Sequence, residues 1–268
     1  MNLAGRTAVV TGAASGIGRA IAISLAARRC HLALADIDEA GLAQTCGILD
    51  SRGVNVSRHL LDVADPSAVA ALPITVAQRH AKVDLLFNNA GVAVGGSFDE
   101  VSDADFQWLF SINFWGVVHM TRAFLPLLRQ SDEARIVNIS SLFGLISPPG
   151  QTAYSASKFA VRGFSNALRY ELEGSTVALT VVHPGGIATS IARNARKPKD
   201  MPAAHIDQAL ARIEKLLRMP PERAAEIIVR GVAKGRARIL VGMDAKVGSL
   251  VERLMPVSYW SLLGRALQ

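Results

Sequence analysis

The sequence predicts an α/β protein, a doubly wound parallel sheet of about seven strands with helices on both faces, in a single domain covering residues 1–268. Short apolar runs alternate with helical stretches along the chain, and 50% of its residues are hydrophobic, enough to bury one large core. We find no internal repeat and no linker. The strand-like runs are residues 6–10, 31–36, 56–61, 83–88, 134–140, 176–183 and 237–242.

A glycine-rich turn, Thr11-Gly-Ala-Ala-Ser-Gly-Ile-Gly18, follows the first run, and a helical stretch begins directly after it. Small residues here let the backbone turn tightly and approach a pyrophosphate, whose charge is favoured by the N–H groups and dipole of the helix. A glycine triplet alone is a weak signal, but strand, turn and helix together predict a dinucleotide site. The expected contacts are Gly12, Ser15, Gly16, Ile17 and Gly18.

The second run ends in Asp36, eighteen residues after Gly18. A carboxylate at this position suits an adenosine ribose with free hydroxyls and repels a 2′-phosphate. No Arg or Lys occupies the glycine turn or the two positions after Asp36, so the sequence favours NAD over NADP. Asp is also a common helix N-cap, and Asp36 could cap the following helix in addition to binding ribose.

Tyr154 and Lys158 lie four residues apart in a stretch, 154 to 173, whose composition favours helix, so both side chains project from one face. A free phenol titrates near about 10 and is only about 0.1% ionised at pH 7. A cation about 5 Å away, at an effective dielectric of about 20, favours the phenolate by about two pKa units. The spacing alone is also typical of ordinary helix neighbours.

Two further polar residues accompany this pair. Ser141 closes the apolar run that begins at Ala134, and ligands bind at the carboxyl ends of strands in open α/β sheets. Its hydroxyl could hold a substrate oxygen. Asn113 falls inside the otherwise apolar helical segment 106–128, where a buried amide needs hydrogen-bond partners. A purely structural role, in hydrogen bonds within the core, explains this residue equally well.

These motifs, in this order, resemble the short-chain dehydrogenase/reductase family in its common form, over about residues 5 to 190. The resemblance implies a Rossmann-type fold with a cofactor-binding and catalytic core. The motifs Asn88-Asn-Ala-Gly91 and Pro184-Gly-Gly-Ile-Ala-Thr189 also match the family. The resemblance implies that Asp62 and Val63 contact the adenine. The further cofactor contacts that it implies are Asn89, Ala90, Gly91, Tyr154, Lys158, Pro184, Gly185, Ile187 and Thr189.

The resemblance also implies a mechanism. Tyr154 takes the hydroxyl proton during alcohol oxidation, or donates it during ketone reduction, while a hydride moves to or from the nicotinamide. Lys158 lowers the pKa of Tyr154 and binds the nicotinamide ribose. Ser141 orients the substrate oxygen, and Asn113 holds a water that links Lys158 to solvent. Ser140 is a competing serine, and the family's spacing to the tyrosine selects Ser141.

Substrate choice is assigned to the segment after Pro184. Residues 187–201 are polar and contain proline, which predicts a mobile lid, followed by amphipathic helices at about 204–217 and 221–234, so residues 187–235 form the lid and its helices. Residues 142–149 and 92–94 predict an apolar pocket near Tyr154, although core packing explains them equally well. The candidate substrate contacts are Ser141, Phe143, Leu145, Pro148 and Gln151.

The expected function is therefore an NAD-dependent oxidoreductase that acts on a hydrophobic secondary alcohol or its ketone. One alternative is an NADPH-dependent reductase of the 3-oxoacyl carrier-protein type, although those generally carry a basic residue near the cofactor turn that this sequence lacks. Another is a catalytically silent dinucleotide-sensing or scaffold protein on the same fold. The complete set of four catalytic residues favours an enzyme.

Composition excludes several other classes. The net charge is +7, but its densest parts, 193–199 and 230–238, are interrupted by Pro, Gly and Ala, which favours a solvated surface over a nucleic-acid site. Cys30 and Cys46 are predicted to be buried thiols, and no residue spacing suggests a metal. We expect a cytoplasmic protein, because we see no signal region and no stretch approaching about 20 apolar residues.

The carboxyl extension, residues 245–268, is apolar and contains Tyr259 and Trp260. Three arrangements would cover it: packing on a neighbouring subunit, closure over the substrate pocket, or weak contact with a membrane interface. The helical stretches 103–129 and 154–173 carry many apolar residues, and resembling proteins pair through these helices. We therefore expect a homotetramer or homodimer.

Overall fold

The computed structural model describes residues 1–198, 211 and 214–267, and the side chains of these residues up to Gly264. It contains a seven-stranded parallel sheet in the order β3-β2-β1-β4-β5-β6-β7, which confirms the predicted fold class. No strand boundary lies more than two residues from its predicted position. The strands are β1 Thr7–Thr11, β2 His31–Asp36, β3 Val56–Leu60, β4 Leu85–Asn88, β5 Ala134–Ile139, β6 Val177–Pro184 and β7 Arg238–Val241.

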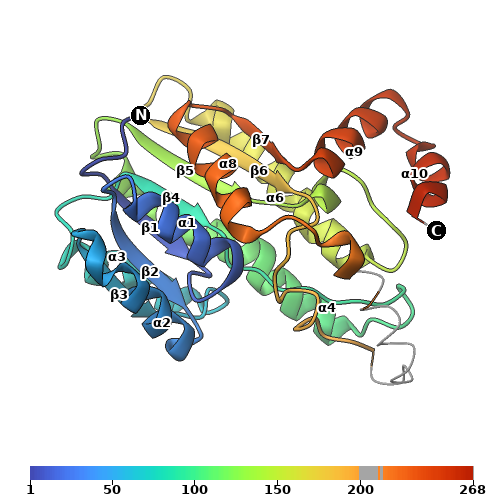
Figure 1. Ribbon diagram of the computed structural model, residues 1–268, viewed down its shortest axis with the longest axis horizontal. Coiled ribbons are helices and arrows are strands. Elements are labelled where there is room, and N and C mark those ends of the chain that lie inside the picture. Colours follow the sequence, from blue (N-terminus) through green and yellow to red (C-terminus); the bar gives the residue numbers. More distant parts are fainter. Residues whose placement is uncertain (199–210, 212–213, 268) are drawn as a thin grey trace.

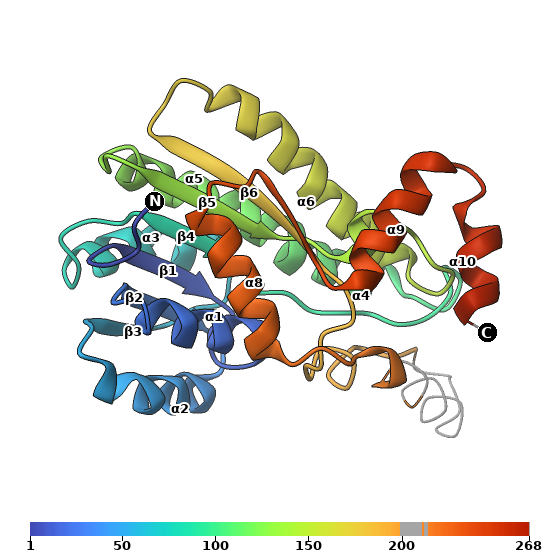
Figure 2. The same ribbon diagram turned by 45° about the horizontal axis from the view of Figure 1, so that its top comes forward.

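Helices cover both faces of the sheet (Figures 1 and 2). On one face lie α1 (Gly16–Ala26), α2 (Glu39–Leu49) and α8 (Pro221–Ala233), and on the other α3 (Pro66–Ala77), α5 (Gly116–Leu128) and α6 (Thr152–Glu171). The predicted long helix 103–129 consists of α4 (Asp103–Phe110), a π turn (Ser111–Trp115) and α5. Beyond β7, the apolar extension forms α9 (Met243–Leu254) and α10 (Tyr259–Leu267).

The strand residues alternate between two apolar cores, as the two-residue period of a strand requires. Ala8 and Val10 of β1 pack with the α1, α2 and α8 side of the sheet, whereas Val9 packs with the α3 and α5 side. Both faces are buried, so these strands read as continuous apolar runs, which explains why their positions could be predicted from sequence.

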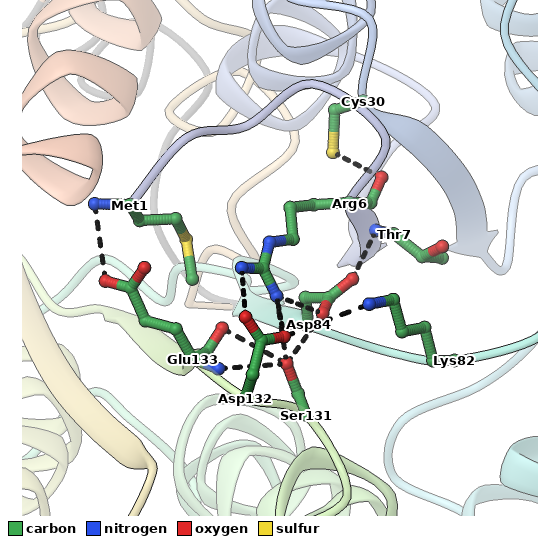
Figure 3. Close-up of polar contacts among 9 residues, drawn as sticks. All are labelled: Met1, Arg6, Thr7, Cys30, Lys82, Asp84, Ser131, Asp132 and Glu133. Atoms are coloured by element: carbon green, nitrogen blue, oxygen red, sulfur yellow. Dashed lines mark hydrogen bonds and ion pairs between the residues drawn. The ribbon is translucent and has the colours of Figure 1, made fainter.

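A polar cluster closes the amino ends of β1, β4 and β5 (Figure 3). Arg6 donates to Asp84 at 2.9 Å and to both oxygens of Asp132 at 2.5 and 2.8 Å. Asp84 is fully buried and also accepts the Thr7 N–H at 2.8 Å and the Ser131 hydroxyl at 2.6 Å. The hydrogen bonds from Arg6 to Asp132 and Asp84 raise the pKa of the guanidinium above its ordinary value.

The cysteines and the segment after β6 differ from the sequence predictions or lie partly outside the described residues. Cys30 is buried, but Cys46 is only partly buried, because it packs against the margin of the apolar core. Most of the predicted helix 204–217 lies outside the described residues. The described part of the predicted lid, residues 187–198, forms turns and two isolated bridges, Val94 to Arg196 and Ile187 to Met219. No described helix is both long enough and apolar enough to cross a membrane.

Candidate active site

The predicted glycine turn connects β1 to α1 at the carboxyl edge of the sheet. Gly12 and Gly16 have φ angles of +66° and +52°, a left-handed conformation that favours glycine. A Cβ on Gly12 would lie 2.8 Å from Asn89 Nδ2, and one on Gly18 would overlap the carbonyl of Gly12. Ser15 precedes α1 without a side-chain cap, and the first turn carries no acidic residue, so the helix start suits an anion.

Asn89 holds this turn in place. Its Nδ2 donates to the carbonyls of Thr11 at 2.9 Å and Gly12 at 3.2 Å, and its N–H donates to the Thr11 hydroxyl at 3.0 Å. The Ala90 N–H donates to the same hydroxyl at 3.0 Å. Asn89 was predicted as a cofactor contact, and its side chain is engaged with the backbone of the glycine turn.

Asp36 lies beside the turn at the end of β2. Its carboxylate accepts the Ala14 N–H at 2.9 Å and the Asp38 N–H at 3.0 Å. The alternative role of Asp36 as a helix cap is wrong, because Asp38 is the N-cap of α2 and accepts the Gly41 N–H at 2.9 Å. The carboxylate of Asp36 is therefore fixed against the glycine turn rather than used to start the helix.

The two residues expected at the adenine follow β3. Asp62 is exposed and accepts the Ala64 N–H at 2.8 Å, which fixes the local turn. Val63 is buried against Gly116, where an added Cβ would lie 2.9 Å from the valine side chain.

Tyr154 and Lys158 lie one turn apart on α6. The Lys158 Nζ is 5.7 Å from the centre of the Tyr154 ring and donates to the Ile139 carbonyl at 3.2 Å. Burial lowers the pKa of Lys158 to about 8. Burial also raises the pKa of Tyr154, and a hydrogen bond with the Ser141 side chain lowers it in part. Burial thus favours the neutral form of both groups.

Ser141 follows β5 and begins a short 3-10 turn, Leu142–Gly144. Its Oγ accepts the Phe143 N–H at 3.0 Å and bonds the phenol of Tyr154. The competing serine, Ser140, is buried and donates its hydroxyl to the Lys158 carbonyl at 2.9 Å. Ser141, as predicted, is the serine that faces the tyrosine.

Asn113 is fully buried in the π turn between α4 and α5. Its Oδ1 accepts the Val92 N–H at 2.8 Å, and its Nδ2 donates to the Val92 carbonyl at 3.0 Å and to the Ser157 hydroxyl at 3.2 Å. A Cβ on Gly91 would lie 3.1 Å from Asn113 Oδ1 and 3.3 Å from Lys158 Nζ, so both groups meet beside this glycine. The side chain of Asn113 thus ties α6 to the loop after β4.

The loop after β6 closes over the glycine turn. Thr189 lies against Gly16, where an added Cβ would be 3.2 Å from the threonine methyl group, and Ile187 is buried. A cleft of about 520 Å³ opens beside these residues. It is lined by Gly16, Ala188, Thr189, Ser190, Arg193, Glu214, Leu217 and Pro221.

The candidate substrate contacts differ in accessibility. Phe143 is half-buried, with its ring 6.2 Å from that of Tyr154 in an edge-on arrangement. Pro148 and Gln151 are also half-buried. Leu145 is fully buried, so in this structure it presents no surface to a substrate. Over the described part of the chain, no cluster of His, Cys, Asp or Glu side chains could hold a metal.

Sequence reasoning missed two residues at this edge. His183 is fully buried, and its Nδ1 donates to the Ser141 carbonyl at 2.9 Å. Burial lowers the pKa of His183 to about 4, so its ring is neutral at pH 7. Asp244, at the start of α9, accepts the Gly186 N–H at 2.6 Å. The only sequence signal was the position of His183 directly before the Pro184-Gly185 pair.

Comparisons with known proteins agree with this geometry. The family model for short chain dehydrogenases matches residues 6–200. A Mycobacterium tuberculosis protein named as an oxidoreductase, SadH, is 46% identical over 265 residues, which cover 97% of this chain and 94% of the relative. The 1-deoxy-11-beta-hydroxypentalenate dehydrogenase of Streptomyces avermitilis is 36% identical over 203 residues, which cover 75% of each chain.

Among solved structures, a short chain dehydrogenase/reductase from Burkholderia phymatum in complex with NAD superposes with a TM-score of 0.88. It is 32% identical to this chain, and the match covers 95% of each of the two chains.

Proposed function

Because the chain belongs to the short-chain dehydrogenase family, we propose that it is an NAD-dependent oxidoreductase that acts on a hydrophobic secondary alcohol or its ketone. The observation that carries this proposal is a buried lysine beside a half-buried tyrosine whose phenol bonds Ser141. Burying an ionisable group is costly, and groups whose pKa values are shifted by burial are typical of acid–base sites.

In the oxidative direction, Ser141 holds the alcohol oxygen next to the phenol of Tyr154, and the phenolate takes the hydroxyl proton. Bound NAD supplies the acceptor for the hydride that leaves the alcohol carbon, so the products are a ketone and NADH. The Lys158 ammonium favours the phenolate, since an opposite charge nearby lowers a phenol pKa. In ketone reduction, Tyr154 returns the proton to the carbonyl oxygen.

The residues around the glycine turn fit NAD. An uncapped start of α1, free of acidic residues, suits a pyrophosphate. The Asp36 carboxylate, held by the Ala14 N–H at 2.9 Å, suits the two ribose hydroxyls and would repel a 2′-phosphate. Ile37, the next residue, is exposed and offers no positive charge. These features support NAD over NADP.

The surroundings of Tyr154 support an apolar substrate. Phe143 stands edge-on to the catalytic ring, and Pro148 lies in the same loop. Such a pocket favours a secondary alcohol with a hydrophobic body over a sugar or a charged acid. The name of one relative, a dehydrogenase of 1-deoxy-11-beta-hydroxypentalenate, is that of an enzyme acting on a hydroxy compound.

Assembly as a homotetramer or homodimer is part of this proposal. Aromatic residues gather on α4, the π turn and α6, where Phe114 makes edge-on contacts with Phe110 and Phe164. Trp115 beside them is 49% exposed, which leaves a large aromatic surface for a second copy. Light scattering that finds a stable monomer at micromolar concentration would contradict this.

The test is NADH formation by the purified protein with a panel of short aliphatic, aryl, terpenoid and steroid secondary alcohols, each offered with NAD and with NADP. We expect turnover with at least one bulky apolar alcohol, a preference for NAD, and turnover reduced on the order of 10³-fold in Tyr154→Phe. A preference for NADP would contradict the role of Asp36. Turnover retained in Tyr154→Phe would contradict the acid–base mechanism.

A further inference from the structure

The helices of the carboxyl extension lie beyond the carboxyl ends of the strands, beside the start of α6 (Figures 1 and 2). Two loops meet there. One is the cofactor-side loop, residues 184–189, and the other is the substrate-side loop, residues 142–149. Helix α9 contacts both loops, and α10 contacts the substrate-side loop, which makes three separate contacts.

The first contact joins α9 to the cofactor-side loop. Asp244 accepts the Gly186 N–H at 2.6 Å, and its other oxygen accepts the Ala245 N–H at 2.9 Å. A Cβ on Gly185 would overlap the Asp244 carboxylate. Glycine at position 185 therefore makes room for this carboxylate, and Asp244 in turn orients the backbone of the loop.

The second and third contacts join the extension to the substrate-side loop. A Cβ on Gly248 would lie 2.7 Å from the Leu142 side chain and 3.6 Å from that of Ile146, so α9 packs closely on this loop. The Ser147 N–H donates to the Tyr259 hydroxyl at 3.0 Å, which brings α10 onto the loop's outer end. Both ends of the substrate-side loop are thus held by the extension.

We propose that α9 and α10 act as a clamp that fixes the two loops relative to each other, with Asp244 as a positioning residue for the cofactor side and Tyr259 for the substrate side. This inference rests on the proposed function, and it selects pocket closure among the three arrangements expected from sequence. The carboxyl extension then determines specificity for its own chain, because it sets the position of Phe143 and Pro148.

The test separates the two ends of the clamp. In Asp244→Ala we expect the NAD dissociation constant, measured by calorimetry, to rise at least about 10-fold, the effect of one lost hydrogen bond to a charged group, while the alcohol KM at saturating NAD changes less than about 2-fold. In Tyr259→Phe we expect the reverse, a KM for a bulky alcohol raised about 5-fold with unchanged NAD affinity. Asp244→Asn keeps an acceptor oxygen and should recover most of the lost affinity.

Hydrogen exchange gives a readout that needs no turnover. Asp244→Ala should speed amide exchange in residues 184–189, and Tyr259→Phe in residues 142–149, each leaving the other loop unchanged. Leu250→Gln is the matched control, since Leu250 lies on α9 with its side chain 58% exposed, and it should alter neither loop.

The possible outcomes distinguish a failure of the clamp from a failure of the proposed function. Separate effects on the two loops in a protein that oxidises no alcohol would support the clamp and contradict the proposed function. Normal alcohol oxidation with both variants indistinguishable from Leu250→Gln would overturn the clamp and leave the function intact. A lowered Tm with equal losses in NAD affinity and alcohol KM in both variants would show a purely structural extension and would also overturn it.

Discussion

The two ends of the sheet differ in whether a buried charged group is paired with an opposite charge. At the amino end, the buried Asp84 is paired with Arg6 and accepts two further hydrogen bonds, from Thr7 and Ser131 (Figure 3). At the carboxyl end, Lys158 is 4% exposed, and within the described residues its ammonium group donates to a backbone carbonyl and pairs with no carboxylate.

This difference in pairing gives the two ends different roles, one in stability and the other in the proposed chemistry. At the amino end the two carboxylate partners raise the pKa of Arg6 and keep it charged, whereas Lys158 has a pKa of about 8 instead of 10.5. A lowering of this size corresponds to about 3 kcal/mol of unfavourable burial of the charged form. The amino end is thus suited to stabilising the fold, and the carboxyl end holds the groups proposed for catalysis at a cost in stability.

The largest expected effect is on catalysis at the carboxyl end. Tyr154→Phe removes the proton acceptor, so kcat should fall on the order of 10³-fold, the usual size of an acid–base contribution. The Tm should stay within the error of the wild-type value, because the aromatic ring remains. Steady-state kinetics together with a thermal melt would measure both, and a mutant that melts much lower would not report on chemistry.

A comparable effect on stability is expected at the amino end. Arg6→Met leaves the buried Asp84 without its ion-pair partner, so the free energy of unfolding should fall by about 3–5 kcal/mol. The kcat of the folded protein should be unchanged, since the cluster lies at the opposite edge of the sheet. Denaturant unfolding and kinetics on one preparation would check this, and an unaltered midpoint would show that the cluster does not stabilise the fold.

An intermediate effect is expected at the glycine turn. Asp36→Ala should raise the dissociation constant of NAD about 10-fold and that of NADP less, because the carboxylate binds ribose hydroxyls and repels a 2′-phosphate. Calorimetric titration of both dinucleotides would measure the change in preference. Equal weakening of both would mean that Asp36 acts only through its bonds to the backbone.

The smallest effect is expected at the rim of the amino-end cluster. The Asp132 side chain is 69% exposed, and its hydrogen bonds to Arg6 lower its pKa to about 2. A depressed carboxylate pKa stabilises the fold above its unfolded value of 3.8, and that contribution is lost as the pH falls towards 2. Asp132→Asn should therefore lower the Tm less than Arg6→Met and flatten its pH dependence between about pH 4 and pH 2.

The sequence indicated most of the fold and the candidate site, because both depend on local patterns. Strands buried on both faces appear as apolar runs, and Tyr154 and Lys158 share a helix face at a fixed spacing. The amino-end cluster could not be predicted in this way, since Arg6 and Asp132 lie 126 residues apart and charged residues are common on surfaces.

Two further features could not be predicted from the sequence pattern. The helix cap after β2 is Asp38 instead of Asp36, a choice between two neighbouring aspartates that only the backbone geometry decides. The bond from Gly186 to Asp244 joins residues 58 positions apart, and no motif marks Asp244. The Gly186–Asp244 contact follows from how α9 packs against the loop after β6, which the apolar pattern of residues 245–268 does not specify.

The most direct test of the contrast between the two ends is a comparison of Lys158→Met with the wild type in turnover and in Tm as a function of pH. We expect turnover to fall at least about 100-fold. The unfolded state binds more protons than the folded state between pH 8 and 10.5, so burial of the lysine costs most below pH 8. The Tm of Lys158→Met should therefore exceed that of the wild type at pH 7, and the difference should shrink as the pH rises towards 10.5. A lower Tm at pH 7, or turnover close to that of the wild type, would contradict this account.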